Sequence, residues 1–375
     1  MTSENEGNNV VAILAFVLSF LSMFLNSVLI FIIIRTTILH TNTNFFLMSL
    51  SLGEVLVAVC VTPFAGLANI SRQLVSSETF CAISGFGNSL GSTAAFLSLL
   101  MVTIDRCVAI SQPLKYSSII GKWTVATMIS YAWLHSLFLT TFPFFLESVY
   151  VFAPRYSMCL VFTDVQPTCS YVIGFLGSFL PAFVILCTVV KIIKEARYHH
   201  RIFAVIVPSH LYDGSYQQQN TSYGRTTMKA LRALLFIIGG YALFRLPLYV
   251  VTIVDETHGK NLSQELVTSF VWMSFLCGTI NPTAIILFNK TFKRTFFQTV
   301  GILCIRLLGK SNKENFSISS GLYSMLDATL VINKLQNKSS IRHSATLERI
   351  RPQPQLQLQN RHLVIKRSTS FPSFA

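Results

Sequence analysis

Seven stretches of apolar residues, each long enough to cross a lipid bilayer, follow one another along the chain. A helix needs about 20 apolar residues to span the hydrocarbon core. Only the second and the sixth stretch contain a charged residue, Glu54 and Arg245 respectively. Strands of a membrane barrel would be about ten residues long and would alternate in polarity, so the pattern favours helices. The sequence therefore predicts an all-α membrane protein with spans over residues 10–34, 45–70, 80–104, 123–146, 165–190, 233–254 and 266–288.

Composition and charge support this interpretation. The 375 residues are 52% hydrophobic and only 12% charged, whereas soluble domains carry about 25% charged residues. An N-terminus outside the cell puts most of the 29 Lys and Arg residues on the cytoplasmic side, where basic residues are retained. We therefore expect a multi-pass protein of the plasma membrane with its N-terminus outside. Its basic face suits anionic membrane lipid and acidic partners, and gives no reason to expect nucleic acid binding.

The chain divides into four predicted parts. Residues 1–9 form a short extracellular N-terminus and residues 10–289 a domain of seven transmembrane helices. Residues 290–304 combine basic and Phe side chains in a pattern typical of an amphipathic eighth helix along the inner leaflet. Residues 305–375 form a basic, Ser-rich cytoplasmic tail that we expect to be disordered. Cys304 is a candidate for palmitoylation and Asn261 for glycosylation in an outer loop.

The eight cysteines are scattered, without the close spacing of a zinc or redox site. Cys81 opens the third span at its outer end, and Cys159 lies in the second outer loop, so both face the oxidising side of the membrane. A disulfide between them is therefore chemically allowed, with Cys169 as the competing partner. No set of nucleophile and base or of metal ligands indicates an enzyme, a metal site or a cofactor.

Several residues spread over the seven spans together resemble the rhodopsin-like (class A) G-protein-coupled receptors. Arg106 lies 25 residues after Cys81, which is the spacing in that family between the disulfide cysteine and the activation arginine. The residues that carry the resemblance are Asn26 in the first span, Asp105-Arg106-Cys107 at the cytoplasmic end of the third, Trp133 in the fourth, Pro181 in the fifth, Pro247 in the sixth and Asn281-Pro282 in the seventh.

The resemblance implies a seven-helix bundle with a Cys81–Cys159 disulfide that couples to a heterotrimeric G protein. Arrestin and receptor kinases are further implied partners. Within the family, short strings at 133–137, 229–231, 289–291 and 316–319 are similar to an orphan ciliary receptor that raises cyclic AMP. That similarity implies the stimulatory G protein and, as an alternative location, the primary cilium. The residues implied in activation and coupling are Asp105, Arg106, Asn281, Pro282, Pro247 and Pro181.

Two charges inside the membrane are the most unusual feature of the sequence. Glu54 occupies the position of the family's sodium-binding Asp, but Ala95, Cys277 and Gly278 replace its partners. Arg245 stands where the family has its toggle Trp, and an arginine at this depth must face the interior and find an acid. We predict a buried polar network of Glu54, Arg245, Asn26 and Asn281. Arg245 either pairs with Glu54 or points into a wet cavity where it binds an anionic ligand.

Other departures from the family concern the ligand and the active state. Asn88 replaces the Asp with which amine receptors bind an ammonium group, so a biogenic amine is not expected. Ile285 and Val189 replace two Tyr residues whose hydroxyls meet in the family's active state. Thr227 replaces an acid that restrains the activation arginine in many relatives, which predicts elevated basal activity. The residues predicted to line a pocket for a small aromatic or anionic molecule are Asn88, Arg245, Phe270, Trp272 and Phe275; packing alone is the alternative for the aromatic ones.

Three hypotheses for the function follow. The first is an orphan receptor that transmits an extracellular or constitutive signal to a G protein and raises cyclic AMP. The second is a protein with the receptor fold that does not activate G proteins and acts as an interaction or trafficking partner. The third is a transporter or channel that uses Glu54 and Arg245 as an ion path, which the lack of an internal repeat disfavours.

Overall fold

The computed structural model describes residues 2–71, 77–145, 150–161, 167–206, 232–257 and 261–308. Within these ranges the side chains of 9–71, 77–145, 150–161, 171–198, 232–255 and 261–301 are placed. Residues 1–301 form one compact unit. Thr227, the side chains of Cys169 and Cys304, and tail residues 309–375 lie outside the described set, so the predictions made for them stay predictions.

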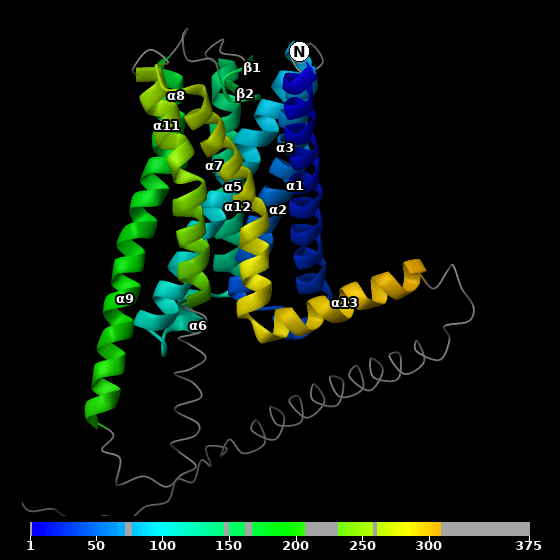
Figure 1. Cartoon of the computed structure of the whole chain (residues 1–375). Helices are drawn as coiled ribbons and strands as arrows, with labels where there is room; N and C mark the ends of the chain where they lie inside the picture. Colours follow the sequence, from blue (N-terminus) through cyan, green and yellow to red (C-terminus); the bar gives the residue numbers. More distant parts are fainter. Residues whose placement is uncertain are drawn as a thin grey trace, which may run out of the picture. The chain divides into compact units, whose positions relative to one another are not determined.

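The seven predicted spans are confirmed as seven helices long and apolar enough to cross a membrane (Figure 1). The first helix, α1 (Thr2–Arg35), begins within the segment predicted as a short N-terminus. The third, fourth and seventh spans are the helices α5 (Glu78–Ser111), α7 (Lys122–Phe145) and α12 (Gln264–Phe288). Each lies within a few residues of its predicted limits, apart from α5, which runs on to Ser111.

Three spans are interrupted. The second consists of α2 (Asn42–Cys60) and α3 (Thr62–Ile70), which join at Val61. Pro63 lies in the first turn of α3, where its missing N–H is tolerated because no helical partner is needed there. The fifth consists of α8 (Pro167–Gly174), the π-helical turn η2 (Phe175–Phe179) and α9 (Leu180–Ile206). The sixth, Arg232–Asp255, contains a turn at Arg245 before α11 (Leu246–Thr257).

Shorter elements lie between the spans. A 3-10 turn, η1 (Thr37–Leu39), follows α1, and α6 (Tyr116–Ile119) follows α5. The second outer loop contains a hairpin of β1 (Tyr150–Ala153) and β2 (Met158–Val161), in which Phe152 pairs with Cys159. We did not predict this hairpin. After the seventh span, α13 (Lys290–Leu308) is the predicted eighth helix and continues four residues beyond its predicted end.

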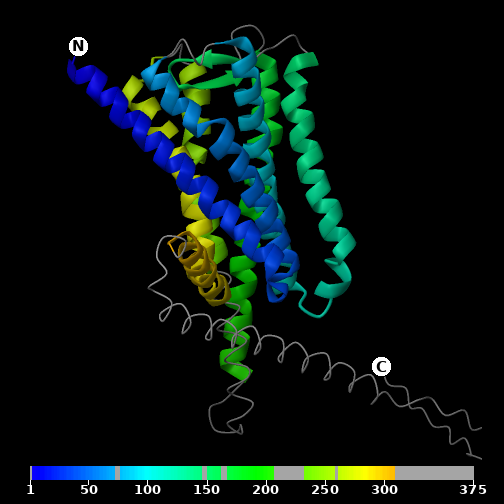
Figure 2. The same ribbon diagram turned by 90° about the vertical axis from the view of Figure 1, so that its right-hand side faces the viewer.

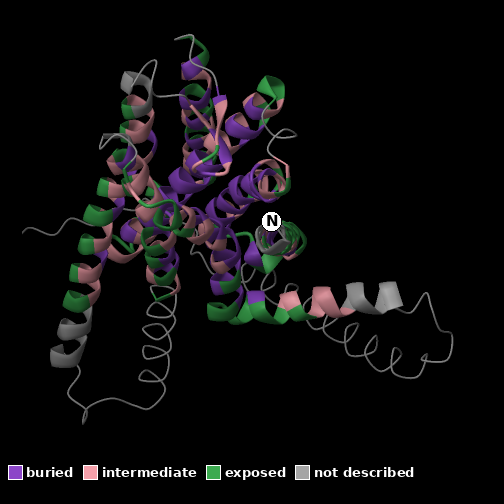
Figure 3. Ribbon diagram, turned by 45° about the horizontal axis from the view of Figure 1, so that its top comes forward, coloured by how far each residue is buried: buried purple, intermediate pink, exposed green. Residues whose placement is uncertain are grey.

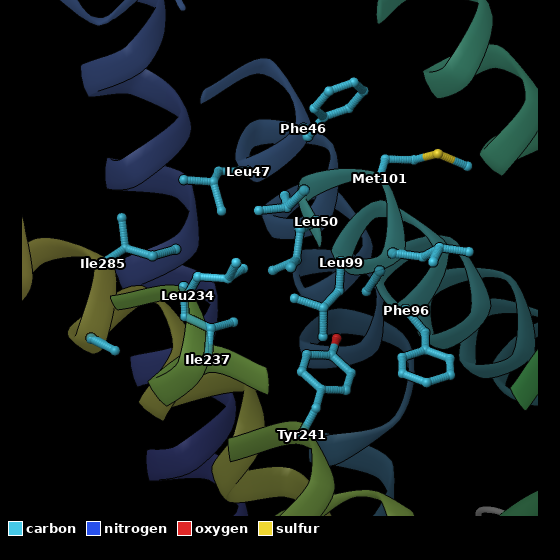
Figure 4. Packing of buried hydrophobic residues seen from close by; sticks show 14 of the residues in the cluster. Phe46, Leu47, Leu50, Phe96, Leu99, Met101, Leu234, Ile237, Tyr241 and Ile285 are labelled. Atoms are coloured by element: carbon cyan, nitrogen blue, oxygen red, sulfur yellow. The ribbon is translucent and has the colours of Figure 1, made fainter. Parts of the chain in front are cut away.

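The helix α5 forms the middle of the bundle. Of the seven spans it has the largest buried share, 72%, whereas the fifth span has 17%. Figure 3 shows the same contrast between the inner helices and the largely exposed α9. Residues of α2, α5, the sixth span and α12 meet in one apolar cluster, in which Figure 4 shows Tyr241 beside Phe96 and near Leu99.

Close contact between α2 and α5 positions the charged residues of the interior. A Cβ atom on Gly53 would lie 2.6 Å from the carbonyl oxygen of Gly91, and one on Gly91 would lie 2.7 Å from the carbonyl oxygen of Gly53. Small residues let helix backbones approach in this way. Glu54 and Ser92, the residues that follow the two glycines, are thereby brought to the same level of the bundle.

Candidate functional site

Arg245 and Glu54 form a buried ion pair in the middle of the bundle. Nη1 of Arg245 donates to Oε1 of Glu54 at 2.9 Å, and the two side chains are only 8% and 1% exposed. Nη2 of Arg245 donates to Oγ of Ser92 at 3.0 Å. Of the two placements of Arg245 that the sequence left open, the structure has the pairing with Glu54.

Tyr241 is a second donor to the same carboxylate, and we did not predict it. Its hydroxyl lies 2.5 Å from Oε1 of Glu54. The ring of Tyr241 stacks on Phe96 with 5.7 Å between the centroids, and Cζ of Arg245 lies 5.8 Å from the centre of the Tyr241 ring. Two donors from the sixth span therefore converge on one oxygen of Glu54, so the span-6 helix is tied to α2.

The backbone around Arg245 allows this arrangement. Pro247 has no N–H to donate to the carbonyl four residues earlier, and its ring crowds that carbonyl, which interrupts the helix. The N–H of Arg245 still donates to the carbonyl oxygen of Tyr241 at 3.0 Å, so these two residues lie one turn apart on the same face. The turn at Arg245 therefore leaves both side chains directed at Glu54.

Gly278 leaves room for the glutamate, which is one methylene longer than the aspartate of the family. A Cβ atom on Gly278 would lie 3.2 Å from Oε2 of Glu54 and 2.6 Å from Oγ of Ser22. The guanidinium of Arg245 supplies the positive charge beside the carboxylate. Among the described residues, no three His, Cys, Asp or Glu side chains come together to hold a metal.

The two asparagines that we grouped with the ion pair have other partners. Nδ2 of Asn26 donates to the carbonyl oxygens of Ser22 and Gly278, both at 2.8 Å. Nδ2 of Asn281 lies 3.4 Å from Sγ of Cys277. Both side chains are fully buried. The asparagines thus support the helix contacts around Glu54 rather than bonding to either charge of the pair.

The three prolines that we predicted to take part in activation lie in the fifth, sixth and seventh spans. Pro181 is buried in the first turn of α9, directly after the π-helical turn η2. Pro282 lies inside α12 and is buried. Pro181 and Pro247 thus each lie next to an irregular turn of their span, whereas Pro282 lies within a continuous helix.

A second polar cluster lies near the C-terminal end of α5. Asp105 is fully buried and accepts hydrogen bonds from Arg106, at 2.7 Å from Nη2, and from Thr43 Oγ1 at 2.6 Å. Its other oxygen accepts from the hydroxyl of Tyr116 at 2.6 Å. The Arg106 side chain also bonds to Thr43 and remains 26% exposed. The arginine is held by its neighbour but remains accessible at the end of the bundle.

Tyr116 ties the segment between α5 and α7 to this cluster. Asn42 donates to the carbonyl oxygen of Ile120 at 2.8 Å and lies 3.5 Å from the hydroxyl of Tyr116. Burial, followed by the neighbouring Asp105 carboxylate, raises the pKa of the Tyr116 phenol above its usual value. The phenol therefore stays protonated and continues to donate to Asp105 at physiological pH.

At the outer end, the predicted disulfide between Cys81 and Cys159 is present. It joins α5 to the hairpin, whose Met158 side chain is buried. Nδ2 of Asn88 lies 3.9 Å from Sδ of Met158, and Oδ1 of Asn88 accepts from Ser92 at 3.1 Å. A chain of polar contacts thus runs from the ion pair through Ser92 and Asn88 to the hairpin.

The residues predicted to line a ligand pocket are separated in the structure. Trp272 and Phe275 pack edge to face and line a small hollow beside the hairpin. Arg245 and Asn88 take part in the polar chain and are not among the residues around this hollow, nor is Phe270. The other residues that line it are Ala65, Arg155, Tyr156, Ser157, Thr268 and Val271.

A buried carboxylate at the outer end of the sixth span, Asp255, fastens the hairpin. Arg155 in the hairpin turn donates to both oxygens of Asp255, at 2.7 Å for the Nη2–Oδ1 bond. The hydroxyl of Tyr156 and the N–H of Leu262 donate to the same carboxylate at 3.1 and 3.2 Å. Nε2 of Gln264 donates to the carbonyl oxygen of Arg155 at 2.8 Å. These hydrogen bonds join the second and third outer loops.

We expect Asp255→Asn to lower the free energy of unfolding by about 1–2 kcal/mol, because the Arg155 guanidinium loses its charged partner. The hydrogen bonds that Arg155 donates to Asp255 raise the pKa of Arg155 above its usual value, so the guanidinium cannot adapt by losing its proton. Thermal unfolding of the purified protein in detergent measures the effect. Glu265→Gln, at an exposed acid in the first turn of α12, is the matched control, and equal stability of the two variants would contradict the prediction.

Comparison with known proteins identifies a family and several relatives of this chain. The family described as "7 transmembrane receptor (rhodopsin family)" matches residues 25–284. The 5-hydroxytryptamine receptor 4 of Cavia porcellus is 27% identical over 281 residues, which cover 70% of this chain and 71% of that receptor. The G protein-coupled receptor 161 of Bos taurus is 28% identical over 313 residues, which cover 78% of this chain and 59% of that receptor.

The fold has a close counterpart among solved structures. The crystal structure of squid rhodopsin superimposes with a TM-score of 0.71 at 16% sequence identity, over 83% of this chain and 89% of that one. The family match covers well over half of the chain and includes the charged pair, the Asp105 cluster and the seventh-span Asn281-Pro282. The chain therefore belongs to the rhodopsin family of seven-transmembrane, G-protein-coupled receptors.

Proposed function

We propose that this receptor activates the stimulatory G protein and thereby raises cyclic AMP, with basal activity in the absence of a ligand. The observation that carries the proposal is the cluster around Asp105 and Arg106. The cluster presents the partly exposed guanidinium of Arg106 at the cytoplasmic end of the central helix. The Asp105 carboxylate that binds this guanidinium also accepts hydrogen bonds from Thr43 and Tyr116. If Arg106 moves away, the buried Asp105 carboxylate therefore still accepts hydrogen bonds from Thr43 and Tyr116.

The release of Arg106 would create a donor for the end of a G-protein helix. A guanidinium bonds well to carbonyl and carboxylate groups of a partner because its donors lie in one plane. Basic residues around the cytoplasmic ends of the helices, including Lys115, Lys191 and Lys194, would attract an acidic partner surface. Arrestin and receptor kinases, which read the same face in this family, are proposed as further partners.

The pair of Arg245 and Glu54 would restrain this activity. Arg245 and Tyr241 belong to the sixth span, and both bond to Glu54 of α2. A displacement of the sixth span away from α2 would separate two opposite charges inside the membrane, which is unfavourable in a medium of low dielectric constant. The pair therefore favours the arrangement observed here over one with the sixth span moved outward.

We propose that a ligand of this receptor, in addition to its basal activity, is a small aromatic or anionic molecule. The name of the 5-hydroxytryptamine receptor relative denotes an amine ligand, but this chain has Asn88 where an amine receptor needs a carboxylate. Asn88 is also engaged by Ser92. Trp272 and Phe275 line the outer hollow together with Tyr156, so we propose that these aromatic residues meet the ligand before any deeper residue does.

The proposed location is the plasma membrane, with the N-terminus outside and with the primary cilium as the alternative. We propose Asn261 as a glycosylated residue, since it is exposed in the third outer loop. Palmitoylation of Cys304 would anchor the end of the eighth helix at the inner leaflet.

One observation favours a second candidate, a receptor-fold protein that does not activate G proteins. Ile285 is 4% exposed, and Val189 packs against the same apolar cluster. Neither side chain has the hydroxyl with which the family's active state is stabilised. The protein would then act as an interaction or trafficking partner.

Basal cyclic AMP distinguishes the two candidates. Cells that express the wild type or Arg106→Ala at equal surface level are compared without added ligand. We expect a raised level in the wild type that returns to the background of untransfected cells in the variant. Ser117→Ala, at an exposed uncharged residue of α6, is the control and should keep most of the signal. Equal background levels for wild type and Arg106→Ala would overturn stimulatory coupling and favour the second candidate.

A further inference from the structure

The outer hollow beside the hairpin combines one positive charge with flat apolar surfaces. Figure 2 shows the two strands of the hairpin, drawn in green, lying across one end of the bundle. The hollow is lined by Arg155 of the hairpin turn and by three aromatic residues, Tyr156, Trp272 and Phe275. Trp272 and Phe275 meet edge to face, with 5.7 Å between the ring centroids. None of the described residues that line the hollow is acidic, so its lining offers no counter-charge to a cation.

Arg155 keeps one edge of its guanidinium unused. A guanidinium has five N–H donors. Nε and Nη2 of Arg155 donate to the two carboxylate oxygens of Asp255, and Nη2 also donates to the carbonyl oxygen of Leu262. These bonds take up the donors of Nε and Nη2, whereas Nη1 has no hydrogen-bond partner among the residues that the structure describes. Two N–H groups of a charged side chain that is 21% exposed therefore remain for another acceptor.

Two other side chains of the hollow also have donors without an acceptor. Nε1 of Trp272 and the hydroxyl of Ser157 bond to none of the described residues, although both side chains are half-buried. Deeper in the bundle such a group is paired, since Nε1 of Trp133 donates to Oγ of Ser49 at 3.0 Å. An indole N–H can only donate. A molecule that fills the hollow must therefore bring acceptor oxygens of its own.

We propose that the outer hollow binds a small aromatic carboxylic acid. The inference rests on the receptor function proposed above, because it names the chemical class of the ligand. The carboxylate accepts hydrogen bonds from Nη1 of Arg155, and the ring lies against Trp272 and Phe275. A carboxylate matches the planar donors of a guanidinium, and an aromatic ring packs favourably against aromatic neighbours.

The charges around the hollow select a ligand with a single negative charge. A cationic ligand would meet the positive charge of Arg155 and would find no acid in the lining. A doubly charged group, such as a phosphate monoester, would be repelled by the Asp255 carboxylate, which binds the same guanidinium. The small size of the hollow limits the ligand to one ring system. An aromatic monoacid satisfies all three conditions.

Asp255 competes with the ligand for Arg155. Both carboxylates accept from one guanidinium, so the attraction of Arg155 to Asp255 lowers its affinity for a second acid. Asp255→Asn removes this negative charge and keeps the size of the side chain. We therefore expect the variant to bind the acid about tenfold more tightly than the wild type, even though the protein itself is less stable. A residue that only supported the fold would weaken binding when it is replaced.

Thermal unfolding of the purified full chain in detergent, with a probe molecule at millimolar concentration, tests the proposal. Phenylacetate is the probe, phenylacetamide has the same shape without the charge, and phenethylamine carries the opposite charge. We expect the melting temperature to rise with the concentration of phenylacetate, because a ligand that binds the folded state stabilises it. Phenylacetamide and phenethylamine should have little effect. The assay contains no G protein, so a response to phenylacetate in a receptor that does not raise cyclic AMP would support the binding site and contradict the signalling function alone.

Variants of the lining show where the probe binds, each compared with its own melting temperature without ligand. Arg155→Gln should lower the affinity for phenylacetate about tenfold. Trp272→Phe keeps a ring and removes one donor, should lower the affinity about threefold, and serves if Arg155→Gln does not fold. Glu265→Gln, at an exposed acid of α12, is the matched control for Asp255→Asn and should bind like the wild type. No shift with phenylacetate, an equal shift with phenylacetamide, or an unchanged response in both lining variants would overturn the proposal. An affinity of Asp255→Asn no higher than that of Glu265→Gln would do the same.

Discussion

Replacing Arg245 with glutamine should lower the free energy of unfolding by about 3–5 kcal/mol, because the Glu54 carboxylate is then buried without its cation. Glu54→Gln should be destabilising to a similar extent, since it leaves the guanidinium without a counter-charge at 8% exposure. The two losses should not add. The double variant removes both charges and keeps two polar side chains of nearly equal length, so it should recover most of the stability of the wild type.

Thermal unfolding of purified variants in detergent, followed in parallel with surface expression, measures this double-mutant cycle. Ser92→Ala is the matched control, because it removes the 3.0 Å hydrogen bond to Arg245 but leaves the charges in place; a loss of about 1 kcal/mol is expected. If the losses from Arg245→Gln and Glu54→Gln simply add in the double variant, the two residues do not stabilise each other and our account of the core is wrong.

Basal signalling should rise about five- to tenfold in Asp105→Asn. The substitution removes the charge that holds Arg106, Thr43 and Tyr116 together, while the amide keeps the size of the side chain. A hydrogen bond to a charged group contributes about 1.5–3 kcal/mol, and a shift near the lower end of that range changes the ratio of two states about tenfold. Cyclic AMP at matched surface expression, without ligand, is the measurement.

Two further variants show whether the rise comes from a released Arg106. Tyr116→Phe removes one of the donors to Asp105 and leaves the arginine paired, so it should raise the basal level much less. Asp105→Asn combined with Arg106→Ala should signal no more than cells without the receptor. A combined variant that keeps the raised level would show that Arg106 does not carry the signal.

The spans could be predicted from the sequence because a run of about 20 apolar residues is the length that a helix needs to cross the bilayer and is rare in other structures. Their interruptions could not be located as well. Pro63 and Pro181 lie close to two of them, yet the break at Val61 and the π-helical turn Phe175–Phe179 depend on how neighbouring helices pack. The end of α9 at Ile206 also lies well beyond the apolar run, because a helix can continue past the membrane without any change of period.

The contact between Arg245 and Glu54 was one of two placements that the sequence allowed. The choice depends on the close approach of Gly53 and Gly91 and on the turn before Pro247, neither of which is visible in a pattern of apolar residues. A bond from Tyr241 to either charge was not predicted. Its hydroxyl reaches Glu54 because it lies one helical turn before Arg245 on the same face.

The outer ion pair was missed altogether, although a signal existed. Asp255 is an acid at the outer end of an apolar span, and Arg155 is one of only three basic residues that the predicted topology placed outside. A comparison of isolated opposite charges at the same membrane surface would have suggested the pair. The hairpin that carries Arg155 has no strong alternation of polar and apolar residues, so its strands were not predicted.

Nucleotide exchange on purified stimulatory G protein, catalysed by the purified receptor in lipid discs, is the most direct test of the central claim that Arg106 transmits a signal. No ligand is added, and wild type is compared with Arg106→Ala at equal receptor concentration, with thermal unfolding as a check that both are folded. Our account predicts faster exchange with the wild type than without receptor, and no acceleration with the variant. Exchange at the uncatalysed rate with folded wild-type receptor would contradict it.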